Sequence, residues 1–143
     1  MLQVKRIIIY STISTQNFPD PASGLIIGKS PEFDAADTKI AIGAAAAALP
    51  SLRKKTGRER SKLLRKWYDL IVENREDLAR LITLENGKPL EDATGEVMYA
   101  AGFLEWFSEE APRVYGKTIP ASLAGNRVMT IKEPIGVCGL ITP

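Results

Sequence analysis

The sequence predicts an α/β fold, and three features of its 143 residues support this. Residues 34–111 carry apolar side chains at helical spacing, divided by capping and helix-breaking residues. After Pro112 the pattern changes to the two-residue period of β-strands. The final run, "IGVCGLIT" at 135–142, is apolar without alternation, which is typical of a strand covered on both faces in a parallel sheet.

The composition excludes several kinds of site. The chain has no histidine, which removes Ser-His-Asp and Cys-His arrangements and every imidazole metal ligand. Its one cysteine allows neither an internal disulfide nor a thiolate zinc cluster, so we predict no metal site. A net charge of +2 is too small to imply an acidic partner. No apolar run approaches the roughly 18 residues needed to cross a bilayer, so no membrane partner is predicted.

The N-terminal stretch, residues 1–17, reads "MLQVKRIIIYSTISTQN". It contains Lys5, Arg6 and several hydroxyl residues, with no acidic residue before Asp20, and it weakly resembles a mitochondrial presequence. It has no clear amphipathic arginine pattern, so a short strand or a disordered tail is the simpler interpretation. We therefore expect a cytoplasmic protein, with a mitochondrial location as the alternative.

A hairpin and a helix are predicted next. In residues 20–33, Pro21, Ser23 and Gly24 form a turn before a short strand at 25–27. Asp34 can cap the following helix, which consists almost entirely of small residues. We expect Pro50 to end that helix.

Three further helices are predicted from local signals. Thr56 and Glu59 form a capping box in front of a helix whose apolar face is expected to point inward. Asn74 can start a third helix, and Gly87 suits the left-handed position at its end. A fourth helix is expected at about 90–110. The inward residues of the helix after the capping box are Leu63, Leu64, Trp67, Leu70 and Ile71.

Two extended runs, 114–120 and 127–134, follow the helices and are separated by the turn sequence "ASLAGN". Charge is also uneven along the chain. Residues 53–66 hold eight basic side chains against Glu59 alone, whereas residues 85–110 hold seven acidic ones against Lys88 alone. These faces could steer helix packing or the approach of a partner, or they could be two solvated faces of one folded unit.

One long stretch carries a family resemblance. It reads "RERSKLLRKWYDLIVENREDLARLITLENGKPLEDATGEVMYAAGFLEWFSEEAPRVYGKTIP" and is followed, after a short gap, by "IKEPIGVCGLITP". It resembles the N-terminal part of the aldehyde dehydrogenase superfamily. The phrases "LITLENGKPL" and "FLEWFSEEAPRVYG" are most similar to the succinate-semialdehyde branch. The resemblance covers residues 18–143, and residues 1–17 form a divergent tail outside it.

The resemblance implies a division of the chain. Residues 34–111 would be a helical layer on the nucleotide-binding domain, and residues 114–133 would supply two strands of an oligomerisation arm. Residues 135–143 would be the first strand of the Rossmann-type parallel sheet. The chain would then be an N-terminal fragment that stops just before the family's Trp-Asn-Phe-Pro motif, whose asparagine helps to hold the oxyanion. The family also implies a homo-oligomer, either a dimer or a tetramer.

The implied activity is oxidation of a small aldehyde, succinate semialdehyde, to succinate with NAD or NADP, in 4-aminobutyrate degradation. The family's nucleophilic cysteine, its activating glutamate and its ribose-binding lysine belong to later motifs. We therefore predict no catalytic residue here, no activity and no bound cofactor for this chain alone. The alternative is a non-catalytic module that binds through the basic residues 53–66 or the arm strands. Trp67 and Tyr68 suit an inward face better than base stacking, so no nucleic-acid partner is predicted.

Cofactor contact is predicted at the end of the chain. By resemblance, the backbone of Ile141, Thr142 and Pro143 lines the cofactor groove, at the end of a sheet strand where ligands of α/β proteins bind. Cys138 lies within the same apolar run. Because free cysteine is among the most buried residue types, we expect it in the core and not as a nucleophile.

Two weaker candidates lie in the helical part. Phe103, Trp106 and Phe107 could approach a substrate tunnel, although an aromatic stripe at helical spacing is more often core. Lys88, in "ENGKP", could suggest a catalytic lysine. A lysine beside a helix-ending glycine is usually exposed and interacts with the helix end, so we do not expect it to be catalytic.

Overall fold

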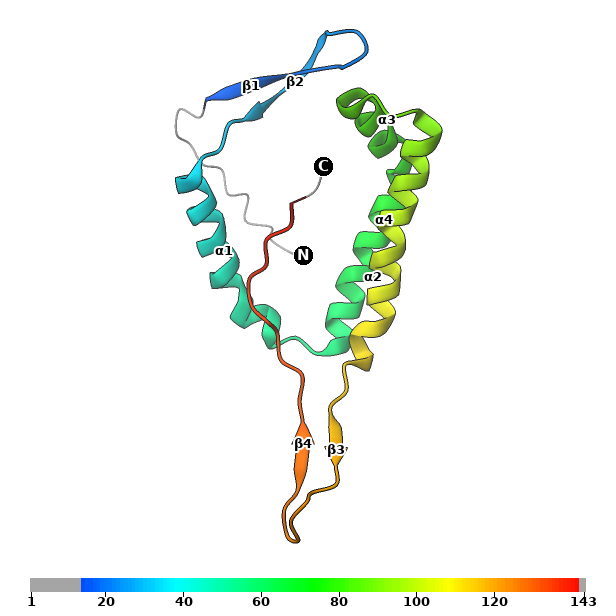
Figure 1. Ribbon diagram of the computed structural model, residues 1–143. Helices are drawn as coiled ribbons and strands as arrows, with labels where there is room; N and C mark the ends of the chain where they lie inside the picture. The colour runs from blue at the N-terminus through cyan, green and yellow to red at the C-terminus, as the bar shows by residue number, and fades with distance from the viewer. Residues whose placement is uncertain (1–13, 142–143) are drawn as a thin grey trace.

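The computed structural model describes residues 14–141 and combines four helices with two small antiparallel sheets in that part of the chain (Figure 1). In chain order the elements are β1 (Thr15–Pro19), β2 (Ile26–Pro31), α1 (Ala35–Arg53), α2 (Gly57–Glu73), α3 (Arg75–Asn86), α4 (Leu90–Glu110), the 3-10 turn η1 (Ala111–Arg113), β3 (Lys117–Ile119) and β4 (Val128–Thr130).

The packed part of the molecule is a helical layer made of α2, α3 and α4. Helix α4 runs back alongside α2, and α3 packs against α4 at the far end (Figure 1). The fully buried side chains are small: Ala79 on α3 and Ala93 and Ala101 on α4 are each 0% exposed. Small residues let helix backbones approach closely, so the layer is held by close contact and not by large buried side chains.

Larger apolar side chains lie at the edges of this layer. Ile71, Leu78 and Ile82 are half-buried and pack against the buried cluster. The prediction that Trp67 and Leu70 point inward is wrong, because their residues are 57% and 47% exposed. Helical spacing identifies an apolar face, but only a neighbouring element can cover it, and α3 and α4 cover just part of this one.

Helix α1 lies opposite α2 and α4 and contains no buried residue (Figure 1). Its predicted start is confirmed, since the carboxylate of Asp34 accepts hydrogen bonds from the backbone N–H of Ala36 at 2.7 Å and of Asp37 at 3.1 Å. Its predicted end is wrong, because the helix passes through Pro50 and ends at Arg53. A proline lacks a donor but keeps its carbonyl, which here accepts the N–H of Lys54 at 3.3 Å.

Two of the three predicted capping signals of the helical layer are confirmed. In the capping box of α2, the N–H of Glu59 donates to Thr56 Oγ1 at 3.2 Å, and the N–H of Thr56 donates to Glu59 Oε2 at 2.7 Å. Gly87 ends α3 in the left-handed conformation with φ 76°. Asn74 precedes α3 as expected, but its side-chain amide donates to the carbonyl of Leu70 at 2.8 Å, so it caps the end of α2 instead.

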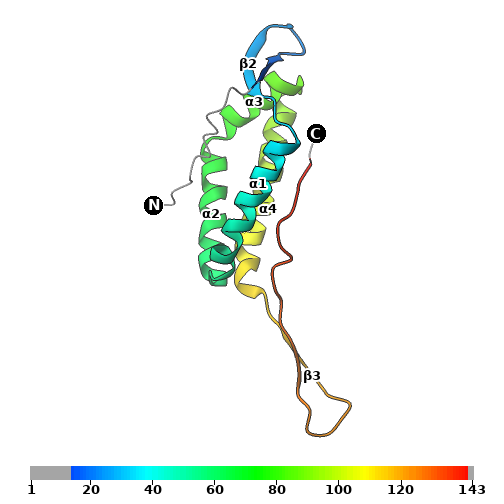
Figure 2. The same cartoon turned by 90° about the vertical axis from the view of Figure 1, so that its left-hand side faces the viewer.

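Two hairpins lie outside the helical layer. The predicted turn of Pro21, Ser23 and Gly24 is confirmed, with the N–H of Gly24 donating to the carbonyl of Asp20 at 2.7 Å, and it joins the antiparallel strands β1 and β2. The strand after the turn is longer than the predicted 25–27, since β2 spans Ile26–Pro31. Strands β3 and β4 form the second hairpin, which projects beyond the ends of α2 and α4 (Figures 1 and 2). Every residue of β3 and β4 is exposed.

The segment after β4 differs from the prediction. Residues 135–141 form no strand, and Ile135 and Leu140 are 94% and 89% exposed. A parallel strand is completed by neighbours reached through a crossover connection, and the residues described here place none beside it. Cys138 is exposed for the same reason, which contradicts its predicted burial.

Candidate functional site

An aromatic hollow on α4 is the first candidate site. Tyr99, Phe103, Trp106 and Phe107 line it together with Gly102, and its volume is ≈ 470 Å³. These positions recur at three- and four-residue intervals, so they share one face of the helix. The Tyr99 and Phe103 rings meet edge to face, with centroids 5.0 Å apart and an interplanar angle of 84°. The result is an open apolar surface suited to a hydrocarbon group.

The sequence favoured a core position for Phe103, Trp106 and Phe107, and that expectation is wrong for the described chain. The three residues are 49%, 62% and 54% exposed. Tyr99, 72% exposed, completes the hollow and was not singled out from the sequence. Its spacing of four residues from Phe103 was the signal that could have identified it.

The predicted cofactor residues lie at the end of the described chain. Ile141 is fully exposed, whereas Thr142 and Pro143 lie outside the described residues. An exposed side chain on a segment without sheet partners does not enclose a ligand. The described residues therefore do not by themselves form a cradle that fits a dinucleotide.

The two reactive side chains discussed from sequence have different surroundings. The thiol of Cys138 lies 3.9 Å from the carbonyl oxygen of Gly136, on a segment without sheet partners in the described chain. Lys88 is held by an ion pair with the carboxylate of Glu96 on α4, which fixes the ammonium group as a structural contact. Within residues 14–141, no group of three or more His, Cys, Asp or Glu side chains is placed to hold a metal ion.

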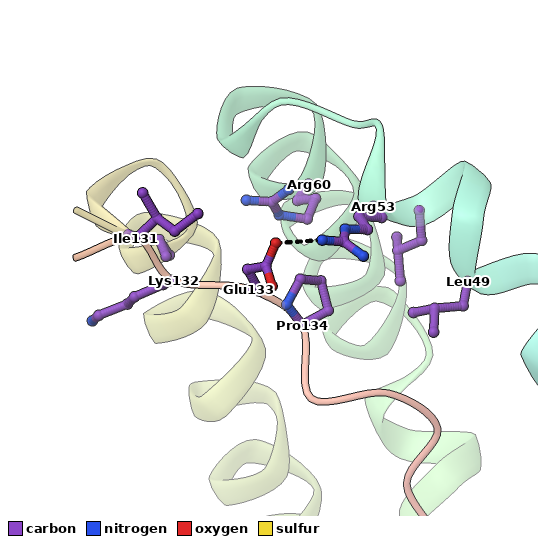
Figure 3. Close-up of a pocket in the computed structure, with 9 residues that line it drawn as sticks. Leu49, Arg53, Arg60, Ile131, Lys132, Glu133 and Pro134 are labelled. Atoms are coloured by element: carbon purple, nitrogen blue, oxygen red, sulfur yellow. Dashed lines mark hydrogen bonds and ion pairs between the residues drawn. The ribbon is translucent and has the colours of Figure 1, made fainter. Parts of the chain in front are cut away.

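A second hollow, also of ≈ 470 Å³, lies where the end of α1, the start of α2 and the segment after β4 meet (Figure 3). Arg53 forms an ion pair with Glu133, which lies 80 positions later in the sequence. Arg60 donates from Nη1 to the carbonyl of Lys55 at 2.6 Å. The lining residues are Leu49, Leu52, Arg53, Arg60, Val114, Ile131, Lys132, Glu133 and Pro134. This hollow could not be predicted from the sequence, because its lining comes from segments far apart in the chain.

The basic and acidic runs meet at one point across the helical layer. Arg65 on α2 lies 3.4 Å from the carboxylate of Glu105 on α4 and 3.3 Å from that of Asp69. Its guanidinium carbon also lies 4.8 Å from the centre of the Tyr68 ring. These contacts favour a role of the opposite charges in helix packing. None of the described helices is long and apolar enough to cross a bilayer.

Comparison with known proteins gives a consistent set of relatives. The family model for the aldehyde dehydrogenase family matches residues 10–143, so the match begins earlier than the predicted residue 18. Glutarate-semialdehyde dehydrogenase of Pseudomonas aeruginosa is 54% identical over 132 residues, which are 92% of this chain and 27% of that protein. The succinate-semialdehyde dehydrogenase (NADP(+)) of Escherichia coli is 52% identical over 124 residues, 87% of this chain and 26% of that protein.

Solved structures agree with these sequence matches. The crystal structure of succinate-semialdehyde dehydrogenase from Burkholderia pseudomallei matches with a TM-score of 0.84 at 50% identity, covering 87% of this chain and 26% of that one. The predicted fold class is thereby confirmed. The chain spans about a quarter of the length of the curated relatives it matches.

Proposed function

Because the chain belongs to the aldehyde dehydrogenase family, we propose that it works as part of an NAD(P)-dependent dehydrogenase of short semialdehydes. The observation that carries this proposal is the identity of 52–54% over at least 124 residues with proteins named for succinate and glutarate semialdehyde. The reaction would oxidise the aldehyde group of succinate semialdehyde, or of its longer homologue, to a carboxylate. For succinate semialdehyde this is a step in 4-aminobutyrate degradation.

A nicotinamide cofactor would take the hydride from the substrate in this reaction. We propose that Ile141, Thr142 and Pro143 contact that cofactor in the whole enzyme. The support is their position at the carboxyl end of an apolar segment that reads as a sheet strand, since α/β proteins bind ligands at the carboxyl ends of such strands. Ile141 is fully exposed in this chain, so in this proposal other parts of the enzyme would complete the groove.

We propose that the aromatic hollow of α4 faces the path of the substrate. A semialdehyde of this class has a short methylene chain between its two polar ends, and methylene groups gain free energy when they leave water for an aromatic surface. Phe103, Trp106 and Phe107 provide that surface and are exposed in this chain. The competing assignment is that another part of the enzyme covers them.

The β3–β4 hairpin supports the proposal of a homo-oligomer. Both strands are exposed and three residues long, and each has one edge without a partner strand in the described chain. Unpaired strand edges readily accept a further strand from another subunit. A cytoplasmic location is proposed, with mitochondria as the alternative that residues 1–17 leave open.

The test compares two proteins in one assay. The complete reading frame that contains this chain and the 143-residue chain alone are each purified. Each is then supplied with succinate or glutarate semialdehyde and with NAD+ or NADP+, and reduced cofactor is followed by its absorbance. We expect turnover from the complete reading frame and none from residues 1–143. A complete product that oxidises neither semialdehyde would overturn the assignment. Turnover by the short chain that survives Cys138→Ser would overturn the expected inactivity.

A further inference from the structure

The hollow at the end of α1 combines an apolar lining with positive charge. Leu49 and Leu52 from α1, Val114 from the segment after η1, and Ile131 and Pro134 from the segment after β4 supply apolar surface. Figure 3 shows Pro134 beside Arg53 and Ile131 on the other side of Glu133. The hollow is also lined by two arginines. Arg53 belongs to the last turn of α1 and Arg60 to the first turn of α2. A small pocket of this composition suits a molecule with one charged end and one hydrocarbon end.

The charges of the hollow do not balance. Arg53, Arg60 and Lys132 carry positive charge, whereas Glu133 is the one acidic side chain in the lining. Glu133 pairs with Arg53, and Figure 3 shows this pair beneath Arg60. Lys132 points away from both arginines in the same view. One guanidinium charge, that of Arg60, is therefore left without an acidic partner among the residues that line the hollow.

Arg60 is also held in place. Its Nη1 donates to the carbonyl of Lys55 at 2.6 Å, and the residue is half-buried. A guanidinium group carries five N–H donors, so one backbone contact leaves donors free for a ligand. Because the side chain is already ordered, a ligand that binds it loses less free energy to ordering the site.

We propose that this hollow is a binding site for a small aliphatic carboxylate, with its carboxylate on Arg60 and its hydrocarbon chain against Leu49, Leu52 and Val114. A planar carboxylate matches the fork of N–H donors on a guanidinium group, and such charge-assisted pairs are stronger than neutral hydrogen bonds. The apolar lining distinguishes this ligand from an inorganic anion. The proposal stands independently of the dehydrogenase assignment, because the hollow is separate from the aromatic hollow of α4.

The test titrates the 143-residue chain with three matched probes: hexanoate, which has both ends, hexan-1-ol, which lacks the charge, and inorganic phosphate, which lacks the chain. Methyl NMR signals of Leu49, Leu52, Val114 and Ile131 report on the hollow. We expect saturable shifts with hexanoate and an affinity about tenfold lower for each of the other probes. Equal responses to hexanoate and hexan-1-ol, or no saturable shift at these methyls, would overturn the proposal.

Three variants complete the test. Arg60→Gln should lower the hexanoate affinity about tenfold, and Arg60→Lys, which keeps the charge but loses the planar fork, should lower it about threefold. Lys66→Gln, on the same helix but outside the hollow, should leave the affinity unchanged. Circular dichroism checks that each variant keeps its helices, and Arg60→Lys keeps the test decisive if the glutamine variant unfolds. Unchanged affinity in both Arg60 variants would rule the site out.

Discussion

The helical layer and the rest of the chain use apolar residues in opposite ways. In the layer, the buried positions belong to small side chains such as Ala79 and Ala93, both 0% exposed. Outside it, large side chains such as Ile135 and Leu140 are 94% and 89% exposed. Helices α2, α3 and α4 follow one another in sequence and can cover one another, whereas the outer segments find no such neighbour. The stability of this chain therefore depends on close contact between a few small residues.

The largest effect is expected from enlarging one of those small residues. Ala93→Leu places extra atoms at a position with no exposed surface on α4, and overpacking of this kind costs about 1–3 kcal/mol of unfolding free energy. Ala100→Leu is the matched control, because Ala100 lies on the exposed side of the same helix and should change stability by less than about 0.5 kcal/mol. Urea unfolding followed by circular dichroism measures both. Equal effects would show that α4 is not closely packed in solution.

A pair of glycine substitutions tests close packing at the other end of the helical layer. A Cβ on Gly57 would lie 2.6 Å from the carbonyl oxygen of Ala111 and 3.0 Å from Cα of Pro112, both backbone atoms. We expect Gly57→Ala to destabilise the layer by about 1–2 kcal/mol.

Gly95→Ala is the control for this substitution. A Cβ on Gly95 meets nothing within 4 Å, so alanine should stabilise α4 by about 0.5–1 kcal/mol. Thermal unfolding of both variants should therefore shift in opposite directions. A shift in the same direction would mean that η1 does not rest on the start of α2.

The sequence predicted the local parts of this fold well. The starts of α1 and α2 and the end of α3 were predicted because Asp34, the pair Thr56 and Glu59, and Gly87 act on backbone groups within four residues. Pro50 was misjudged because its missing N–H leaves only the carbonyl of Ala46 without a helix donor, and at that exposed position water can supply the hydrogen bond. Burial was predicted less well, because it depends on which distant segment covers each face.

The candidate sites show the same limit. The resemblance identified the family before any geometry was available, because long ordered motifs such as "LITLENGKPL" are specific. The exposure of Cys138 and of the α4 aromatics could not be predicted from apolar patterning, which does not distinguish a covered face from an uncovered one. The hollow around Arg53 and Glu133 joins residues 80 positions apart, and the sequence offered no signal for that contact.

The stability of α1 and α2 should depend on pH, because each of these helices is capped by a carboxylate. The N–H of Thr56 donates to Glu59 and lowers the pKa of that carboxyl, with further help from the Thr56 hydroxyl. The N–H of Asp37 likewise lowers the pKa of Asp34. Because the pKa of each carboxyl is lower in the folded state, the caps stabilise the helices fully above the unfolded pKa, about 4. This stabilisation is lost as pH falls through the folded pKa. Helicity should therefore decrease in acid.

Glu59→Gln tests the contribution of α2 to this acid response. The amide can still accept a hydrogen bond from Thr56, but it does not titrate. The loss of helicity from about pH 5 downward, through the unfolded pKa of about 4 and then the lowered folded pKa, should therefore be smaller. Glu73→Gln, at the other end of α2, is the control. A carboxylate there lies near the negative end of the helix dipole, so its removal should not lessen the loss of helicity in acid. Circular dichroism against pH measures it, and identical curves for wild type and Glu59→Gln would contradict the account.

A smaller effect is expected from the charge contact across the layer. Arg65 and Glu105 lie 3.4 Å apart with side chains 50% and 42% exposed, and exposed ion pairs contribute only about 0.2–1 kcal/mol. A double-mutant cycle with Arg65→Gln and Glu105→Gln measures their coupling, which should fall as salt is added. A coupling above about 2 kcal/mol, insensitive to salt, would mean that this pair is desolvated and that the layer is held by charge as well as by small residues.

Residues 135–141 should contribute nothing to the free energy of unfolding but should control association between chains. Leu140 is 89% exposed and lies in an apolar run without strand partners, and such a run is a template for pairing between chains. Leu140→Lys should leave the urea midpoint unchanged and clearly reduce light scattering, because like charges oppose edge-to-edge pairing. Lys132→Gln, which lies before the run, is the control and should not reduce scattering. If the wild-type chain is instead a monodisperse monomer that scatters no more light than Leu140→Lys, residues 135–141 do not drive association, and that result would favour a binding module over a part of an enzyme.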